Sequence, residues 1–210
     1  LPPHTDVIKT LQEESVKPNV HGYQSYKGSP VLRKAMNEWY QRWYHVELNP
    51  DSEILPLIGS KEGIMHICMT YLNPGDKVLV PNPGYPTYRS AVMLAGGKCT
   101  EYKLLQKNNY KPDFDTLEKT NLSKVKLMFV NYPQMPTGQL PSKELFENIV
   151  AFAKKHHILL VHENPYSFIL NNTPMSLLRR EGAKEQGSEL NSLSKSHNMA
   201  GWRVGMVCGA

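Results

Sequence analysis

Short runs of apolar residues recur along this chain and are separated by amphipathic segments. Most of the runs are too short for a helix and are rich in Val, Ile and Leu, which is typical of strands buried on both faces. The pattern therefore predicts seven strands, at residues 54–58, 77–80, 99–104, 125–130, 158–161, 190–193 and 204–208.

Three amphipathic helices are predicted between these runs. The first begins at Ser29-Pro30, because serine can cap a helix and proline tolerates its first turn. The second covers residues 62–71, and the third begins at Ser142. Strands that alternate with helices imply right-handed crossovers. The predicted fold class is therefore α/β, a three-layer sandwich with a mostly parallel seven-stranded sheet, in which ligands bind outside the carboxyl ends of the strands.

The composition is that of an ordinary globular chain, with 40% hydrophobic and 20% charged residues among 210. The net charge of +5 is spread along the chain without a block of Lys or Arg, so we expect no nucleic-acid partner. No apolar run is long enough to span a membrane, and no signal peptide is recognisable. We therefore expect a cytoplasmic protein without a membrane partner.

The three cysteines, Cys68, Cys99 and Cys208, are far apart and have no His partners at the spacing of metal ligands. They are interpreted as free thiols in a reducing compartment, and no metal site is expected. Leu1 is not a natural start, and the chain stops just after an apolar run. We therefore expect it to be an internal piece of a longer protein.

Two segments carry candidate chemistry. The turn Gly59-Ser60-Lys61-Glu62-Gly63 joins a strand to a helix, where free backbone N–H groups can hold a phosphate. In the segment 192–205, Lys195 lies between two apolar runs. An amine must be neutral to attack a carbonyl, and burial near another cation lowers the pKa of a lysine amine. Ser192 and Arg203 offer a hydroxyl and a planar fork that suit an anion. The residues alone leave open that Lys195 is a surface lysine in a serine-rich loop.

At this point the chain resembles a known family, the class I/II aminotransferases, which are fold-type I enzymes dependent on pyridoxal phosphate (PLP). It is most similar to their aspartate and LL-diaminopimelate aminotransferase-like branch. The strongest motif is Ser-Leu-Ser-Lys at 192–195, followed eight residues later by Arg in Gly-Trp-Arg-Val-Gly. The other motifs are Tyr-Gln-Ser-Tyr-Lys-Gly at 23–28, Pro-Gly-Tyr-Pro at 83–86, Asn-Tyr-Pro-Gln-Met-Pro-Thr-Gly at 131–138 and His-Glu-Asn-Pro-Tyr at 162–166.

The resemblance implies PLP as the cofactor and transfer of an amino group from an amino acid to a 2-oxo acid. Lys195 would hold PLP as a Schiff base and move the proton of the substrate. Ser192 and Arg203, with the backbone of Ser60 and Lys61, would hold the cofactor's phosphate.

Three tyrosines match further family positions. Tyr85 matches the aromatic residue that stacks on the cofactor ring, and Tyr166 matches the phenol that donates to its ring oxygen. Tyr23 matches a tyrosine that reaches the phosphate in the partner subunit, which implies a homodimer with shared active sites.

Two positions depart from the family pattern. Glu163 stands where the family has Asp, whose carboxylate keeps the ring nitrogen protonated so that the ring accepts electrons. We hypothesise that Glu163 does the same after a small shift. Met135 stands where the family has an Asn that donates to the ring oxygen, and a thioether cannot donate. Gln134 is a candidate replacement donor, and His162 is interpreted as structural.

The expected organisation is an N-terminal segment at 1–29, which contacts the dimer and the cofactor, and a PLP-binding large domain at 30–210. The C-terminal small domain, with the Arg that binds the substrate carboxylate, would lie outside this chain. Two alternatives stay open. One is a different PLP reaction, such as that of a carbon–sulfur lyase, a decarboxylase or a synthase. The other is a catalytically weak module that binds PLP or another ligand.

Overall fold

The computed structural model describes residues 1–209 as one seven-stranded sheet in the order β1-β7-β6-β5-β4-β2-β3. Strand β7 runs antiparallel to both neighbours, β1 and β6, and the other pairs are parallel. The predicted fold class is confirmed. The strands are β1 (Ile54–Leu57), β2 (Lys77–Asn82), β3 (Lys98–Lys103), β4 (Val125–Asn131), β5 (Leu159–Glu163), β6 (Gly187–Ser192) and β7 (Gly205–Gly209).

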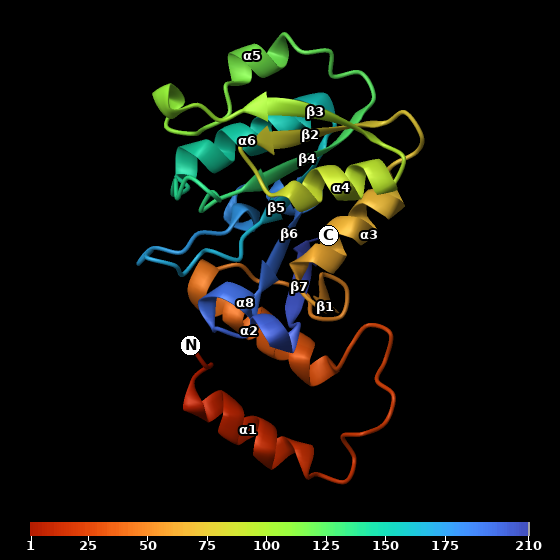
Figure 1. Cartoon of the computed structure of the whole chain (residues 1–210), viewed down its shortest axis with the longest axis vertical. Helices are drawn as coiled ribbons and strands as arrows, with labels where there is room; N and C mark the ends of the chain where they lie inside the picture. The colour runs from red at the N-terminus through yellow and green to blue at the C-terminus, as the bar shows by residue number, and fades with distance from the viewer. Residues whose placement is uncertain (210) are drawn as a thin grey trace.

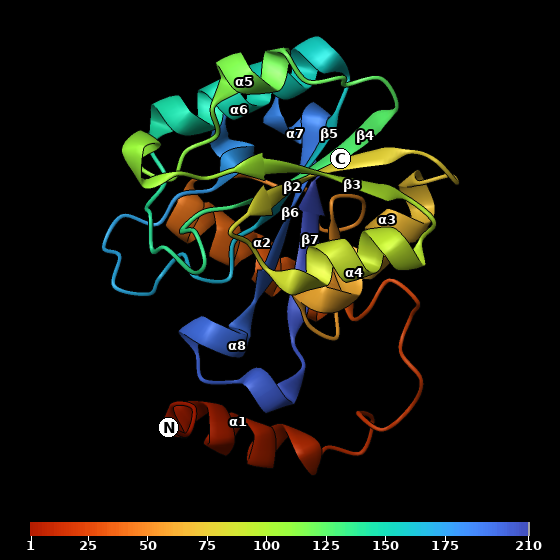
Figure 2. The ribbon, with the colours of Figure 1, turned by 45° about the horizontal axis from the view of Figure 1, so that its top comes forward.

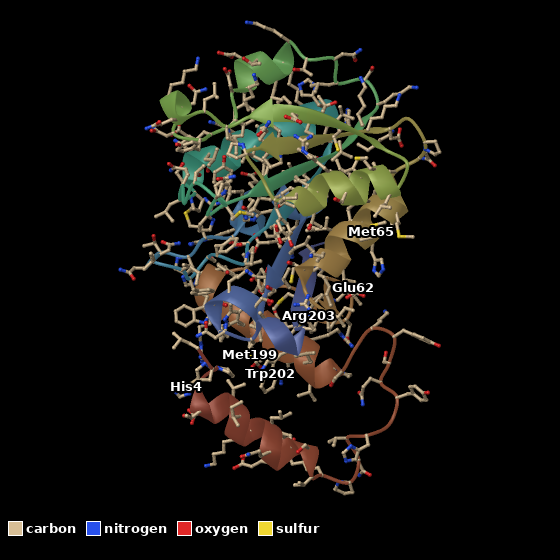
Figure 3. The ribbon with its side chains drawn as sticks, in the orientation of Figure 1. His4, Glu62, Met65, Met199, Trp202 and Arg203 are labelled. Atoms are coloured by element: carbon tan, nitrogen blue, oxygen red, sulfur yellow. The ribbon has the colours of Figure 1, made fainter. Side chains whose placement is uncertain are left out.

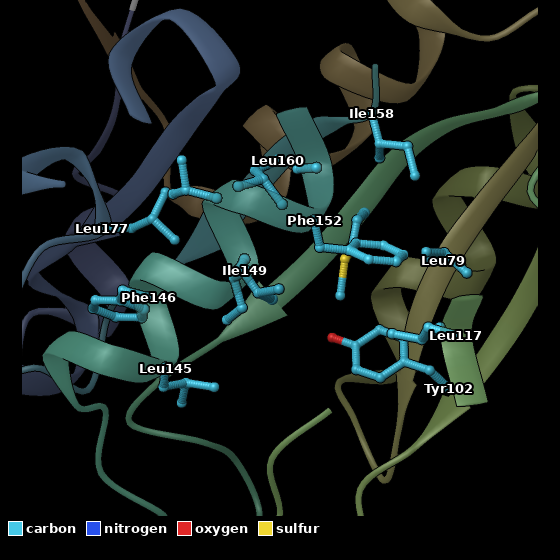
Figure 4. Close-up of a cluster of buried hydrophobic side chains, with 14 of the residues drawn as sticks. Leu79, Tyr102, Leu117, Leu145, Phe146, Ile149, Phe152, Ile158, Leu160 and Leu177 are labelled. Carbon is cyan, nitrogen blue, oxygen red and sulfur yellow. The ribbon is translucent and has the colours of Figure 1, made fainter. Parts of the chain in front are cut away.

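Helices cover both faces of the sheet (Figure 1, Figure 2). Because side chains alternate along a strand, Val78 and Val80 of β2 pack against α3 (Ser60–Tyr71) and α4 (Pro86–Leu94). Leu79 points the other way, into the core that α5 (Phe114–Glu118) and α6 (Lys143–His156) cover (Figure 4). Helix α2 (Pro30–Tyr44) packs against β1 and β7, at one end of the sheet. The sheet therefore lies between two helical layers.

The predicted helix boundaries follow from local chemistry. Pro30 opens α2, as expected, and His45 ends it in the left-handed conformation. The Ser142 side chain accepts a hydrogen bond from the backbone N–H of Leu145 and so caps α6. Helix α3 begins at Ser60, two residues before the predicted start, directly after Gly59.

Some elements differ from the sequence-based expectation. Strand β6 ends at Ser192, and Leu193 begins a short helix, α8 (Leu193–Ser196), because the Ser192 side chain caps it by accepting from the N–H of Ser194. Helix α4 and a further helix, α1 (Thr5–Ser15), were not predicted. Helix α1 buries no residue and lies off the sheet, below α8 in Figure 2.

Within residues 1–209, no helix is long and apolar enough to cross a bilayer. The same residues contain no group of three or more His, Cys, Asp or Glu side chains placed to hold a metal ion.

Candidate active site

Several strands end at one edge of the sheet. Strands β4, β5 and β6 are parallel neighbours that end at Asn131, Glu163 and Ser192. Strand β1 runs in the same direction as β6, because both are antiparallel to β7, so the turn at Gly59 reaches the same edge.

A cavity of about 440 Å³ opens at this edge. Every predicted site residue lines it except Tyr23 and the candidate donor Gln134, and Pro165, Ser194 and Ala200 complete the wall. The full lining is Ser60, Lys61, Tyr85, Met135, Glu163, Pro165, Tyr166, Ser192, Ser194, Lys195, Ala200 and Arg203. The fold therefore brings together residues separated by more than 140 positions.

Tyr23 lies elsewhere, in the segment between α1 and α2, where its side chain is fully exposed. Its predicted role concerns the cavity of a partner subunit, so that role stays a prediction.

Lys195 lies on α8 and lines the cavity. Its Nζ is 6.0 Å from the centre of the Tyr166 ring. Burial raises the pKa of the Tyr166 phenol, and electrostatic interactions with the neighbouring Glu163 and Tyr85 raise it further. Tyr166 therefore stays a protonated donor beside the lysine amine across the physiological range.

Glu163 is the buried carboxyl group of the cavity. Its Oε1 accepts from the Ser60 hydroxyl at 2.9 Å, and its Oε2 accepts from the Tyr88 hydroxyl at 2.6 Å. Burial raises the pKa of Glu163, and the donors Tyr88 and Ser60, with the positive charges of His162 and Lys195, oppose that rise. Each carboxylate oxygen keeps a lone pair for one further donor.

The sequence analysis missed Tyr88. Its ring is buried, stacks on Phe129 with centroids 4.6 Å apart, and meets the Tyr85 ring edge-on at 5.8 Å. It thus connects the buried carboxyl group of Glu163 to the aromatic wall of the cavity. The only signal in the sequence is its position three residues after Tyr85, one turn along α4.

Arg203 joins two parts of the cavity wall. Its Nη2 donates to the Ile58 carbonyl at 2.9 Å, and its Nη1 donates to the Ala200 carbonyl at 2.8 Å. Figure 3 shows it between the first turn of α3, marked by Glu62, and the segment of Met199 and Trp202. A guanidinium has five N–H donors, so some remain for an anion.

Gly59 makes this approach possible. Its φ of +100° lies in a region that side chains rarely adopt, and a Cβ there would be 2.1 Å from Nη2 of Arg203. We expect Gly59→Ala to displace the guanidinium and to weaken phosphate and PLP binding by at least roughly tenfold, the loss of one charge-assisted hydrogen bond of about 1.5–3 kcal/mol.

The matched control is Gly75→Ala, which has a φ of +88° but no atom within 4 Å of the added Cβ. Both variants have the backbone strain, and only Gly59→Ala has the clash. Calorimetric titration with inorganic phosphate and with PLP, together with thermal unfolding, separates the two effects. Equal binding losses in both variants would refute the role given to Gly59.

Met135 lines the cavity from the loop after β4. Asn131 fixes this loop, because its Oδ1 accepts from the Met135 N–H and its Nδ2 donates to the Glu163 carbonyl, both at 2.8 Å. The peptide bonds before Pro133 and Pro136 are cis.

The hypothesis that Gln134 replaces the missing donor is wrong. Its amide Nε2 donates to the carbonyls of Pro83 at 3.0 Å and Met135 at 2.7 Å, and its Oε1 accepts from the N–H and hydroxyl of Thr137. Both amide hydrogens are thus used by backbone carbonyls, one in this loop and one in the loop after β2, and Gln134 does not line the cavity.

Comparison with known proteins defines the class. The sequence pattern of the family "aminotransferase class I and II" matches residues 1–210. The LL-diaminopimelate aminotransferase of Dehalococcoides mccartyi is 46% identical over 211 residues, which cover 100% of this chain and 54% of that protein. Transaminase BacF of Bacillus subtilis is 42% identical over 209 residues, covering 99% of this chain and 52% of BacF.

Solved structures agree. The substrate-bound structure of Bacillus subtilis BacF superposes with a TM-score of 0.96 at 41% identity, over 100% of this chain and 53% of that one. A mutant aspartate aminotransferase of Thermus thermophilus gives a TM-score of 0.91 at 26% identity, over 100% of this chain and 57% of that one. The chain spans about half the length of the relatives it matches.

The chain therefore belongs to the class I and II aminotransferase family. Enzymes of this family depend on PLP, and the cavity fits that cofactor. It contains a lysine amine, a buried carboxyl group, tyrosine rings and, at Ser192 and Arg203, the donors that a phosphate needs. Gly59, which has no side chain, leaves room beside these donors for the guanidinium of Arg203.

Proposed function

We propose that the whole protein is a PLP-dependent aminotransferase that moves an amino group from an amino acid to a 2-oxo acid. The observation that carries this proposal is the cavity itself. The Lys195 amine, the Glu163 carboxyl group and the anion donors Ser192 and Arg203 line one space at the carboxyl ends of the strands.

Each residue has a task that its contacts support. Ser192 uses its oxygen to accept from the Ser194 N–H, which leaves its hydroxyl hydrogen for a phosphate. Arg203 keeps free N–H groups for the same anion, and the first turn of α3, at Ser60 and Lys61, adds backbone N–H groups and the positive end of the helix dipole. Together these groups anchor one end of the cofactor.

The second requirement, besides binding of the cofactor's phosphate, is control of protons at the reacting groups. Bound PLP supplies an electron sink for the substrate carbon. Glu163 would hold a negative charge against the ring nitrogen of the cofactor, and Tyr166 would donate from its phenol to the ring oxygen. The Lys195 amine would hold the cofactor until the substrate amine displaces it, and its Nζ would then take and return the proton of the substrate carbon, as general base and acid.

An absorbance spectrum of the whole protein with PLP, recorded before and after borohydride, tests the proposal. We expect a band near roughly 420 nm, typical of PLP linked to a lysine. Reduction should fix the cofactor on the peptide that contains Lys195, as read by mass spectrometry. A folded protein that shows neither the band nor the modified peptide would favour the weak ligand-binding module instead.

Product analysis separates transamination from the other PLP reactions. Formation of a 2-oxo acid without ammonia indicates transamination, and pyruvate with ammonia indicates elimination. LL-diaminopimelate, which the names of several relatives contain, is the first donor to test. We propose that the Arg that binds the substrate carboxylate lies in a C-terminal small domain.

We further propose a cytoplasmic homodimer with shared active sites. The segment 1–29 would contact the partner, and residues 30–210 would belong to the PLP-binding large domain. The apolar side chains of α1 and the exposed Tyr23 and Tyr26 support this assignment, since α1 buries nothing in its own subunit. The free cysteines agree with a reducing compartment.

Met135 provides a specific test of the altered loop. We expect Met135→Asn to restore a donor to the ring oxygen and to lower the apparent pKa of the lysine-bound cofactor. One hydrogen bond to a charged oxygen contributes about 1.5–3 kcal/mol, which corresponds to roughly one to two pKa units. Absorbance against pH measures the shift, and Met135→Leu, which cannot donate, should show none. The same curve for both variants would exclude this role for position 135.

A further inference from the structure

A second carboxylate lies behind the cavity, completely buried. Glu189 of β6 has 0% exposure, yet it belongs to none of the groups described above. Five donors surround it. Its Oε1 accepts from the hydroxyl of Tyr40 at 3.0 Å and the amide of Asn164 at 3.2 Å, and its Oε2 contacts His162 Nδ1 at 2.8 Å, the hydroxyl of Ser176 at 2.9 Å and the N–H of Leu177 at 3.0 Å.

Two of these partners flank Glu163. In an extended chain, residues i−1 and i+1 point to the same side and residue i to the other. His162 and Asn164 accordingly meet Glu189 on one face of the sheet. Glu163 points to the opposite face, where the hydroxyls of Ser60 and Tyr88 hold it. A single buried carboxylate therefore fixes both neighbours of the cavity's carboxyl group.

The surroundings of His162 define its protonation. Its Nδ1 faces the Glu189 carboxylate, and its Nε2 faces the Tyr132 carbonyl at 3.0 Å. The other four groups at the Glu189 oxygens, Tyr40, Asn164, Ser176 and Leu177, can each donate, and this arrangement suits an ionised carboxylate. Facing an ionised carboxylate and a carbonyl, which both only accept, each ring nitrogen of His162 would supply a hydrogen. The resulting imidazolium would have Glu189 as its paired anion.

We propose that Glu189 is a positioning residue of the active site, which holds His162 as an imidazolium and so keeps Glu163 ionised and directed into the cavity. This inference rests on the proposed function, in which Glu163 acts as a carboxylate. The charge of His162 acts on Glu163 in the required direction, since it lowers the pKa of that carboxyl group against the effect of burial. The other groups that face Glu163 are Tyr88, Ser60, Lys195 and Tyr166.

A purely structural role is the competing explanation, because Glu189 also joins α2, through Tyr40, to the segment at Ser176 and Leu177. Two variants separate the roles. Glu189→Gln removes the charge and keeps the shape. Ser176→Ala removes one donor from the same carboxylate and leaves its charge in place.

The experiment uses the full-length protein without cofactor. Side-chain ¹⁵N NMR reads the two His162 nitrogens, assigned with His162→Gln, and ¹³C NMR reads the Glu163 carboxyl carbon. In the wild type we expect hydrogen on both His162 nitrogens. In Glu189→Gln we expect one of them to be lost and the pKa of Glu163 to rise by about one unit, which equals a roughly tenfold weaker interaction with a protonated ring nitrogen. Ser176→Ala should leave both signals unchanged.

If Glu189→Gln does not fold, the double variant Glu189→Gln/His162→Gln replaces it, since it removes both charges of the pair together. Hydrogen on only one His162 nitrogen in the wild type, or an unchanged Glu163 signal in the charge-free variant, would overturn the inference. These readouts need no cofactor. A failure of the proposed function, seen as no borohydride-fixed adduct in the wild type, is therefore distinguishable from a failure of the positioning role.

Discussion

Replacing Lys195 with alanine is expected to lower turnover by at least roughly 10²–10⁴-fold, the range that a positioned general acid and base contributes. It should also abolish the adduct that borohydride fixes. The reason lies in the cavity, where Lys195 Nζ faces the Tyr166 ring at 6.0 Å and shares one space with Ser192 and Arg203. Steady-state kinetics and mass spectrometry of the reduced protein measure the two effects.

Lys61 is the matched control, because it is the other lysine that lines the cavity. Its Nζ lies 5.8 Å from the centre of the Tyr85 ring, and its assigned role uses the backbone rather than the amine. Lys61→Ala should keep the reducible adduct. An adduct that persists in Lys195→Ala, or that disappears only in Lys61→Ala, would show that the covalent link is not on Lys195.

The sheet could be predicted because its central strands are buried on both faces. Leu79 packs against one helical layer, and Val78 and Val80 pack against the other, so the middle of this strand is a continuous apolar run that is visible in the sequence. The ends of the strands are less visible in the sequence. The pattern predicts that the strand of Ser192 continues to Leu193, but Ser192 caps a helix instead. A serine can continue a strand or cap a helix, and the choice depends on whether its hydroxyl meets the N–H groups that follow it.

The turn at Ser60 and the segment of Ser192 to Arg203 could be placed by the same logic, since residues just after parallel strands meet at one edge. The remaining predicted lining, Tyr85, Met135, Glu163 and Tyr166, came from the resemblance to the family. The partners of those residues could not be predicted. The hydroxyl of Tyr88 and the carboxylate of Glu163 are 75 positions apart, and Tyr40 and Glu189 are 149 apart. No local pattern connects them. Gln134 shows the converse error. Its position next to Met135 suggested that it donates to the cofactor, but its amide hydrogens already bond to the backbone carbonyls of Pro83 and Met135.

Replacing Glu163 with glutamine is expected to separate stability from activity. Burial raises the pKa of this carboxyl group, so the protonated form is favoured more in the folded protein than in the unfolded chain. The corresponding stabilisation is fully present below the pKa of the unfolded chain, and it is lost as the pH rises through the raised pKa of the folded state. Glutamine resembles the protonated carboxyl group at every pH. The Ser60 and Tyr88 hydroxyls can reorient to pair with its amide.

We therefore expect Glu163→Gln without cofactor to be at least as stable as the wild type at neutral pH, with unfolding that depends less on pH. Turnover should nevertheless fall by roughly 10²–10⁴-fold, because removing one partner of a buried charge pair costs about 3–5 kcal/mol and each 1.36 kcal/mol is a factor of ten. Thermal unfolding against pH and steady-state kinetics give the two halves of the result.

Glu163→Asp is the control that separates charge from length. It keeps the carboxylate and restores the residue that is typical of the family, so it should retain most of the turnover, whereas glutamine, which keeps the length, should not. If the glutamine variant were as active as the wild type, the ring nitrogen would not depend on this charge. The hydroxyls of Tyr88 and Ser60 would then serve only to satisfy a buried carboxyl group.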